Sequence, residues 1–309
     1  DGVYLPDIQT SYPAVDFDEL DRLYLSAGHY SFLRLGNLPL RKNSDPLVIT
    51  NLGGQVRVGG CGHHYNFSIT GGKNWILTGE YDVAAATGDV QFKGHADGQY
   101  AHSADTYGIL IDAAFGPGNI GLGVGGGASD FEVAFLEVRN LDFAGMMFKT
   151  DNDGGAHMDN VKIHDNYIHD TISEGVYLGS TQAQPQHKFR NLEFYNNRLI
   201  RTGTEIGQFG NLADGSRIHH NVFLLGALDW KNPFQQYQDN GIQLGHREGS
   251  MSFDHNIVIG AASSGMILFN NDVAGDVHDP SDLLTINNNY FAYSRNRGVY
   301  IHSASDGIK

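Results

Sequence analysis

The segment VKIHDNYIHD at residues 161–170 decides the fold, because four later segments repeat its pattern. Each repeat carries an asparagine at the same place, with an apolar residue three positions before it and another two positions after it. Consecutive asparagines are 31, 24, 35 and 33 residues apart. A period of this kind is typical of a solenoid of stacked coils. The later segments are LEFYNNRLIR (192–201), RIHHNVFLLG (217–226), SFDHNIVIGA (252–261) and LTINNNYFAY (284–293), and the asparagines are Asn166, Asn197, Asn221, Asn256 and Asn289.

A short apolar strand follows each repeat. GVYLG, IGQFG, GMILF and GVYIH begin nine residues after their asparagines, at positions 175, 206, 265 and 298. In the remaining coil GIQLG begins at Gly241, twenty residues after Asn221, which indicates a loop insertion at residues 225–240. No helical segment separates the strands. The predicted fold is therefore all-β: one domain over residues 1–309, a single-stranded parallel β-helix whose strands stack about 4.8 Å apart.

The asparagines and the chain ends complete this prediction. A buried asparagine at a bend can bond the backbone of the neighbouring coils and the next asparagine, so the five are expected to form a ladder. AVDFDELDRLYL at residues 14–25 is predicted to form a short N-terminal capping helix over the open end of the first coil. No comparable cap follows GVYIHSASDGIK. We expect the C-terminal end to be truncated or covered by something outside this sequence.

The predicted helix, followed by SAGHYSFLRL, DPLVITNLGG and the asparagine-bearing coils, resembles the right-handed parallel β-helix proteins of the pectate-lyase-like superfamily. The resemblance covers most of the chain and implies a right-handed helix. That superfamily contains polysaccharide lyases, glycoside hydrolases, uronate epimerases, phage tailspikes and non-catalytic adhesins. It therefore implies a function on glycans. It also implies a protein that is secreted or at the cell surface, although the sequence shows no signal peptide.

The composition narrows the possible partners. The chain has 20 Lys plus Arg against 35 Asp plus Glu, a formal charge of −15, which disfavours nucleic acid. No apolar stretch is long enough to cross a membrane, so membrane insertion is not expected. Cys61 is the single cysteine, so the chain cannot form an internal disulfide. The glycines of GLGVGG at residues 121–126 precede a strand and not a helix, so no organic cofactor is predicted. A polysaccharide is the expected partner.

Aligning the coils places residues in columns along one outer face. Val176, Phe209 and Leu244 are expected to share an inward column. Lys149 is followed in an outward column by glycines, which leave room for a ligand. The neighbouring outward column reads Met147, Tyr177, Gln208, Gln243, Ile267 and Tyr300. Aromatic rings and amides suit sugar rings and hydroxyls. The predicted substrate-binding residues are Tyr177, Gln208 and Gln243, with Trp230, Lys231 and Tyr237 from the inserted loop.

Two glutamates are predicted to be direct neighbours just before successive strands. Carboxylates about 5 Å apart repel each other, so one holds a proton or both bind a cation. Two surface acids that splay apart are the alternative. An acidic turn after Lys149 is calcium-like in composition, although it lacks the spacing of a full calcium loop. The predicted calcium ligands are Glu174, Glu205, Asp239, Asp151 and Asp153.

Three functions stay open, of which a polysaccharide lyase is favoured. Elimination across a uronate needs a neutralised carboxylate, a base for the C5 proton and an acid for the leaving oxygen. Calcium would neutralise the carboxylate, Lys149 or His246 would take the proton, and Arg247 or Tyr177 would assist. A glycoside hydrolase would instead use Glu174 and Glu205 as acid and nucleophile. A non-catalytic β-helix would bind glycans without any proton transfer.

Overall fold

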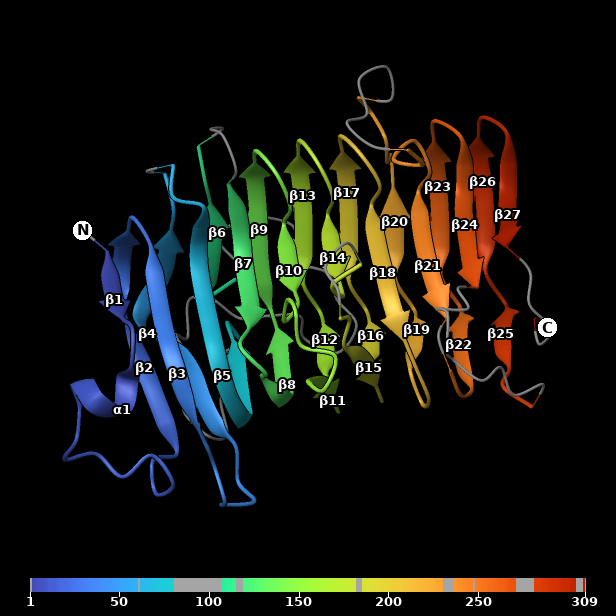
Figure 1. Cartoon of the computed structure of the whole chain (residues 1–309). Helices are drawn as coiled ribbons and strands as arrows, with labels where there is room; N and C mark the ends of the chain where they lie inside the picture. Colours follow the sequence, from blue (N-terminus) through green and yellow to red (C-terminus); the bar gives the residue numbers. More distant parts are fainter. Residues whose placement is uncertain are drawn as a thin grey trace.

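The computed structural model describes residues 2–60, 62–80, 107–114, 119–181, 185–229, 236–246, 248–270, 281–303 and 308. Within them, 27 strands and one short helix form a stack of coils that runs from the N-terminal end to the C-terminal end (Figure 1). Every pairing between these strands is parallel, and strands pair with their counterparts in neighbouring coils. The predicted parallel β-helix is confirmed.

The strands form three faces, which we name A, B and C. Strands β2 (Arg22–Tyr30) and β4 (Leu47–Val58) bend from face B to face C, and β5 (Tyr65–Thr78) bends from face A to face B. Face A also contains β1 (Val3–Leu5), β3 (Leu33–Leu40), β7 (Ile120–Gly125), β10 (Met146–Phe148), β14 (Val176–Leu178), β18 (Gly207–Leu212), β21 (Ile242–His246), β24 (Ser264–Asn270) and β27 (Arg297–Ser303).

The other two faces contain the remaining strands. Face B contains β8 (Ser129–Ala134), β11 (His157–Asp159), β12 (Lys162–His164), β15 (Lys188–Arg190), β16 (Glu193–Tyr195), β19 (Arg217–His219), β22 (Met251–Asp254) and β25 (Leu284–Asn287). Face C contains β6 (Ile109–Asp112), β9 (Leu136–Leu141), β13 (Tyr167–Thr171), β17 (Arg198–Thr202), β20 (Val222–Leu224), β23 (Ile257–Ala261) and β26 (Tyr290–Ser294).

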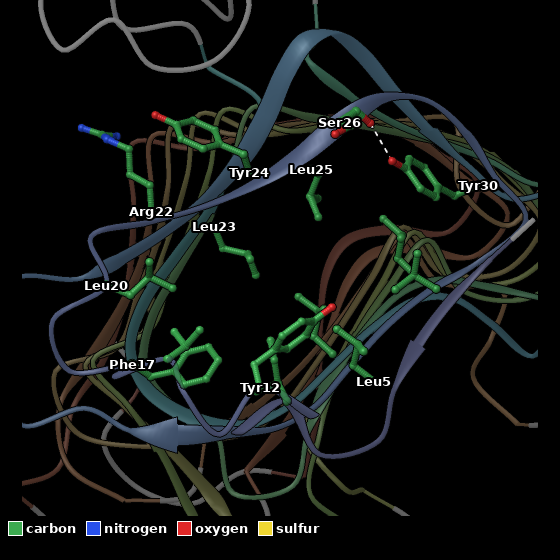
Figure 2. A pocket seen from close by; sticks show the side chains of 15 residues that line it. Leu5, Tyr12, Phe17, Leu20, Arg22, Leu23, Tyr24, Leu25, Ser26 and Tyr30 are labelled. Atoms are coloured by element: carbon green, nitrogen blue, oxygen red, sulfur yellow. Dashed lines mark hydrogen bonds between the residues drawn. The ribbon is translucent and has the colours of Figure 1, made fainter. Parts of the chain in front are cut away.

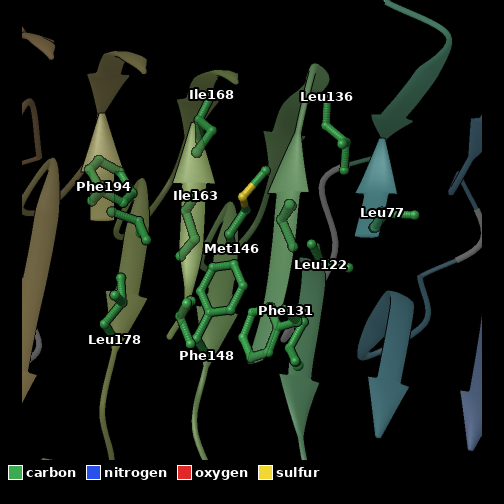
Figure 3. Packing of buried hydrophobic residues seen from close by; sticks show 14 of the residues in the cluster. Leu77, Leu122, Phe131, Leu136, Met146, Phe148, Ile163, Ile168, Leu178 and Phe194 are labelled. Carbon is green, nitrogen blue, oxygen red and sulfur yellow. The ribbon is translucent and has the colours of Figure 1, made fainter. Parts of the chain in front are cut away.

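The core fills the inside of the coils. Alternate residues of each strand point inward, and equivalent residues of successive coils stack on one another (Figure 3). Between faces B and C, the rings of Phe194 and Phe253 (face B) alternate with those of Phe223 and Phe291 (face C) in one stack, whose centroids lie 6.4 Å apart at each step. The burial of apolar side chains at every coil is the main source of stability.

The asparagine ladder is confirmed by hydrogen bonds along its whole length. The backbone N–H of Asn166 donates to Oδ1 of Asn197 at 3.1 Å, and the side-chain amide of Asn166 donates to the same oxygen at 3.0 Å. The same pair of bonds links Asn197 to Asn221, Asn221 to Asn256, and Asn256 to Asn289. The ladder satisfies backbone groups at the bend between faces B and C, which no strand pairing reaches.

The predicted capping helix at residues 14–25 is wrong. The helix of this region is α1 (Ile8–Ser11), which Asp7 caps by accepting a hydrogen bond from the Thr10 backbone N–H at 2.7 Å. Residues 22–30 form β2 instead, because pairing with β4 satisfies the backbone groups at the edge of β4, which a helix would leave without partners. The turn before β2 is held by Arg41, whose guanidinium donates to the carbonyls of Phe17 and Leu20.

The N-terminal end of the solenoid is hollow. The cavity there has a volume of about 420 Å³. Leu5, Phe17, Leu20, Leu23 and Leu25 are among the side chains around it (Figure 2). Beside it the Tyr30 hydroxyl donates to the carbonyl of Ser26 at 2.8 Å. The described parts of the predicted insertion, residues 225–229 and 236–240, lie between β20 and β21. In the described part of the chain, no helix is long and apolar enough to span a membrane.

Candidate functional site

The predicted outward column on face A is confirmed residue by residue. Met147 lies beside Tyr177, Tyr177 beside Gln208, and Gln208 beside Gln243. Ile267 and Tyr300 continue the column. The predicted inward column contained one error. Leu178, and not Val176, lies beside Phe209, because Val176 pairs with Gly207.

Much of this column is covered and offers no open platform to a sugar. Tyr177 is 6% exposed and Ile267 is fully buried. The Tyr177 hydroxyl is 2.5 Å from Oγ1 of Thr181, and the amide of Gln208 donates to the same Oγ1 at 2.7 Å. Thr181 also covers Gly210, one of the glycines that follow Lys149 in the predicted outward column, since a Cβ at Gly210 would lie 2.1 Å from the Thr181 methyl group. Tyr177 and Gln208 therefore contact Thr181 in this structure.

Glu174 and Glu205 are neighbours on successive coils, as predicted, but they are buried and not at the surface. Their side chains are 2% and 0% exposed. Oε2 of Glu174 accepts from the Ser173 hydroxyl at 2.6 Å, and Oε1 of Glu205 accepts from the Gln243 amide at 2.5 Å. Burial raises the pKa of both carboxyls, and the charge of Glu174 raises the pKa of Glu205 further. A pair of this kind retains a proton well above the ordinary glutamate range.

The end of the inserted loop covers this pair. Gln238 is 4% exposed, and its amide lies 3.5 Å from Oε1 of Glu174. The backbone carbonyl of Tyr237 accepts from the Asn240 side chain at 2.8 Å, and the Tyr237 hydroxyl lies 2.7 Å from Nε2 of His302. Asp239 is half-buried, and its charge adds to the raised pKa of Glu205. A sugar cannot reach either glutamate in this conformation.

We expect Glu205→Gln to stabilise the protein at neutral pH. The pKa of Glu205 is raised above its ordinary value of 4.5 on folding, so the folded state binds more protons and its stability falls as pH rises above 4.5. Glutamine keeps the acceptor for Gln243 and removes this penalty. In urea unfolding, the variant and the wild type should match well below pH 4.5 and separate as pH rises. Glu19→Gln, at an exposed glutamate, should show no such separation; an equal one would contradict this account.

Lys149 lies at the centre of a second group of polar residues, at the end of β10. Its Nζ is 3.0 Å from a carboxylate oxygen of Asp151 and 5.8 Å from the centre of the Tyr177 ring. The lysine and aspartate side chains are 26% and 41% exposed, so both are accessible. The other oxygen of Asp151 accepts from the Ser180 hydroxyl at 2.6 Å. Burial acts to raise the pKa of Asp151, but the hydrogen bonds from Ser180 and Lys149 outweigh it and lower this pKa.

Two histidines next to this group were not predicted as site residues. Nε2 of the buried His187 accepts from the backbone N–H of Thr150 at 3.0 Å, and burial lowers the pKa of His187, so its imidazole is neutral. Nδ1 of His157 is buried and has no hydrogen-bond partner within the described residues. Asp153 accepts from the backbone N–H groups of Gly155 and Ala156 and so closes its own turn. The two histidines lie on successive coils, where His157 pairs in register with Lys188, the residue after His187, so the coil repeat was the signal that could have indicated their proximity.

An open groove lies beside Lys149 on face A. It has a volume of about 160 Å³ and runs across β5, β7 and β10. Its lining includes Tyr65, Ser68, Thr70, Gly123, Gly125 and Lys149. Glycine is required at 123, because a Cβ there would lie 2.5 Å from the Tyr65 ring, which leans over that strand. Burial and the charge of Asp151 raise the pKa of Tyr65. Among the described residues that line the groove, Lys149 is the one with a positively charged side chain.

The remaining predicted residues do not join Lys149. His246 is 4% exposed, and its Nε2 is 2.7 Å from the carbonyl of Gly249, so it is not placed to take a proton from a ligand. Trp230, Lys231 and Arg247, like Cys61, lie outside the described residues. Among the residues that are described, no three His, Cys, Asp or Glu side chains are grouped so that they could hold a metal ion. Calcium binding at Glu174, Glu205, Asp239, Asp151 and Asp153 stays a prediction.

Comparison with known proteins agrees with this architecture. A family model described as a right handed beta helix region matches residues 149–309, just over half of the chain. The chain belongs to the right-handed β-helix family. The handedness that the resemblance implied is thereby confirmed. No curated protein sequence matches the chain.

Solved right-handed β-helix structures resemble this one at low identity. An alginate lyase from Paenibacillus sp. str. FPU-7 is 14% identical with a TM-score of 0.49, over 97% of this chain and 98% of that one. Tailspike protein 2 from Escherichia coli O157:H7 bacteriophage CAB120 is 11% identical with a TM-score of 0.47, over 94% of this chain; the match spans 38% of the tailspike. The A-module of a mannuronan C-5 epimerase from Azotobacter vinelandii is 14% identical with a TM-score of 0.37, over 98% and 94% of the two chains.

Proposed function

We propose that this β-helix protein is a carbohydrate-active enzyme, a polysaccharide lyase that cleaves a uronate-containing glycan in the groove beside Lys149. The observation that carries the proposal is the position of Lys149. A chain with a formal charge of −15 repels an acidic polymer unless a local cation receives its carboxylates. The Lys149 ammonium is accessible, lies at an open groove and is held in place by Asp151 at 3.0 Å.

The residues around Lys149 have the roles that elimination needs. The ammonium of Lys149 pairs with the uronate carboxylate and so makes the C5 proton easier to remove. Asp151, ionised because its pKa is lowered, accepts that proton. The electron pair of the C5–H bond forms the C4–C5 double bond as the bond from C4 to the glycosidic oxygen breaks. Tyr65, whose raised pKa keeps its phenol protonated, donates a proton to the leaving oxygen.

The hydrolase alternative has less support. It needs two accessible carboxyl groups on opposite sides of the glycosidic bond. Glu174 and Glu205, the pair that the sequence suggested for this role, lie beneath Gln238 and are 2% and 0% exposed. Binding without catalysis is the outcome that remains if the protein makes no cleavage products.

The test is ultraviolet absorbance of the unsaturated sugar while the protein acts on a panel of uronate polysaccharides, with carboxyl-reduced versions of each polymer as controls. We expect absorbance to rise with at least one uronate polymer and with no reduced one. The rise should persist in a chelator, because Lys149 supplies the positive charge in the groove; its loss would favour the calcium site. New reducing ends without absorbance would indicate hydrolysis. The absence of both signals would overturn the enzyme proposal.

A further inference from the structure

A second cation lies on face A in line with the groove. Arg34 of β3 pairs in register with Ser68 of β5, which lines the groove, and Ser68 pairs with Gly123 of β7. Gly123 in turn pairs with Met147 of β10, two residues before Lys149. Arg34 and Lys149 thus belong to the same outer face. Three strand spacings separate β3 from β10, which is about 14 Å along the solenoid axis.

Aromatic rings hold Arg34, and no acid neutralises it within the described part of the chain. Its guanidinium carbon lies 5.7 Å from the centre of the Tyr4 ring and 5.3 Å from that of Phe32. Its Nε is buried and has no hydrogen-bond partner among the described residues. Four arginines on faces B and C differ in this respect, because Arg57, Arg139, Arg201 and Arg217 each form an ion pair with an aspartate. Arg34 is therefore a positive charge held by ring contacts and without a counter-ion among the described residues of a strongly acidic protein.

We propose that Arg34 forms a second carboxylate-binding subsite, so that the groove accepts a polyuronate chain running along the solenoid axis from Arg34 to Lys149. This inference rests on the proposed function, because it extends the same binding face. A guanidinium offers a planar fork of donors that matches a carboxylate, and the contacts with two rings hold that fork in place. The half-buried Ser68 is a polar position between the two cations, and the Tyr65 ring lies over Gly123 next to it.

The distance between Arg34 and Lys149 determines which ligands can bind both cations. Two cations separated by three strands cannot bind the carboxylate of one sugar. They can bind carboxylates of sugars several units apart in the same polymer. The ligand class is therefore an extended polymer with repeated negative charges, and a single uronic acid or a neutral glycan is excluded from binding both subsites at once.

The test measures binding without turnover, in a Lys149→Met background. Calorimetric titration compares Lys149→Met with Lys149→Met/Arg34→Gln, using a long oligomer of a uronic acid and its carboxyl-reduced counterpart. We expect the arginine change to weaken binding of the charged oligomer about tenfold, with a smaller effect at high salt. Binding of the reduced oligomer should not respond to the arginine change. Arg57→Gln in the same background is the matched control, because Arg57 is on face C and pairs with Asp112.

The outcomes separate this inference from the proposed function. Equal affinity of the two proteins for the charged oligomer, with unchanged thermal unfolding, would overturn the subsite. An equal loss with the reduced oligomer would also overturn it, since the contact would then not involve a carboxylate. Failure of the lyase proposal would appear differently, as intact binding by the wild type with no unsaturated product.

Discussion

Asn221→Leu lowers the free energy of unfolding by about 3–5 kcal/mol. Asn221 is 1% exposed and lies in the middle of the ladder. Its Oδ1 accepts from the backbone N–H of Asn197 at 2.9 Å, and its Nδ2 donates to the carbonyl of Phe194 at 2.9 Å and to Oδ1 of Asn256 at 3.0 Å. Leucine has a similar size but leaves these buried groups without partners, and each unsatisfied group is costly in an apolar interior.

Urea unfolding followed by circular dichroism measures this effect, and the ladder itself provides the control. Asn289 makes the equivalent bonds to Asn256 and Phe253 but is only partly buried, so water can replace what a leucine removes. Asn289→Leu should therefore lower the free energy of unfolding clearly less than Asn221→Leu does. Equal small losses at both positions would show that the ladder contributes little beyond what solvent provides.

Lys149→Met abolishes most of the proposed lyase activity, with a loss of about a hundredfold to a thousandfold in kcat/KM. Methionine keeps the length of the side chain and removes the charge that receives the uronate carboxylate. Lys149→Arg keeps the charge, so it should retain a substantial part of the activity. The measurement is the initial rate of ultraviolet absorbance on the polymer that gives the strongest signal.

Two comparisons make this result interpretable. Lys73→Met removes another lysine that pairs with an aspartate, Asp130, at 3.2 Å, and should leave the rate unchanged. Thermal unfolding should be similar for all variants, because Lys149 is partly exposed. If Lys149→Arg is as inactive as Lys149→Met, Lys149 acts as the proton acceptor and not as a fixed charge. Full activity of Lys149→Met would place the reaction elsewhere.

The fold could be predicted because its determinants repeat. A column of asparagines has one structural explanation, and the alternation of short strands then sets the register of whole coils without knowledge of long-range contacts. The largest error occurred where the repetition ends. Residues 14–25 have a helical pattern in isolation, but the β4 strand provides backbone partners for β2, and this tertiary pairing outweighs local helix preference.

The site could be predicted only in part. Register placed Tyr177, Gln208 and Gln243 in one column and Glu174 beside Glu205, since both follow from stacking alone. Strand register carries no information about which loops cover a residue. The burial of the two glutamates under the loop around Gln238 could therefore not be predicted. Tyr65 and Arg34 lie in N-terminal coils that lack the asparagine motif, and these coils could not be aligned to the later ones by sequence.

The stacking of strands in register also constrains how the length of this chain can change. A single residue lost within a strand would exchange the inward and outward side chains of that strand. A whole coil gained or lost would leave every other residue on its original side. Length differences between the coils lie in the bends, since the asparagine spacing varies from 24 to 35 residues while the paired strands keep their register. The distance along the solenoid axis between two binding positions on the outer face can therefore change only by whole strand spacings.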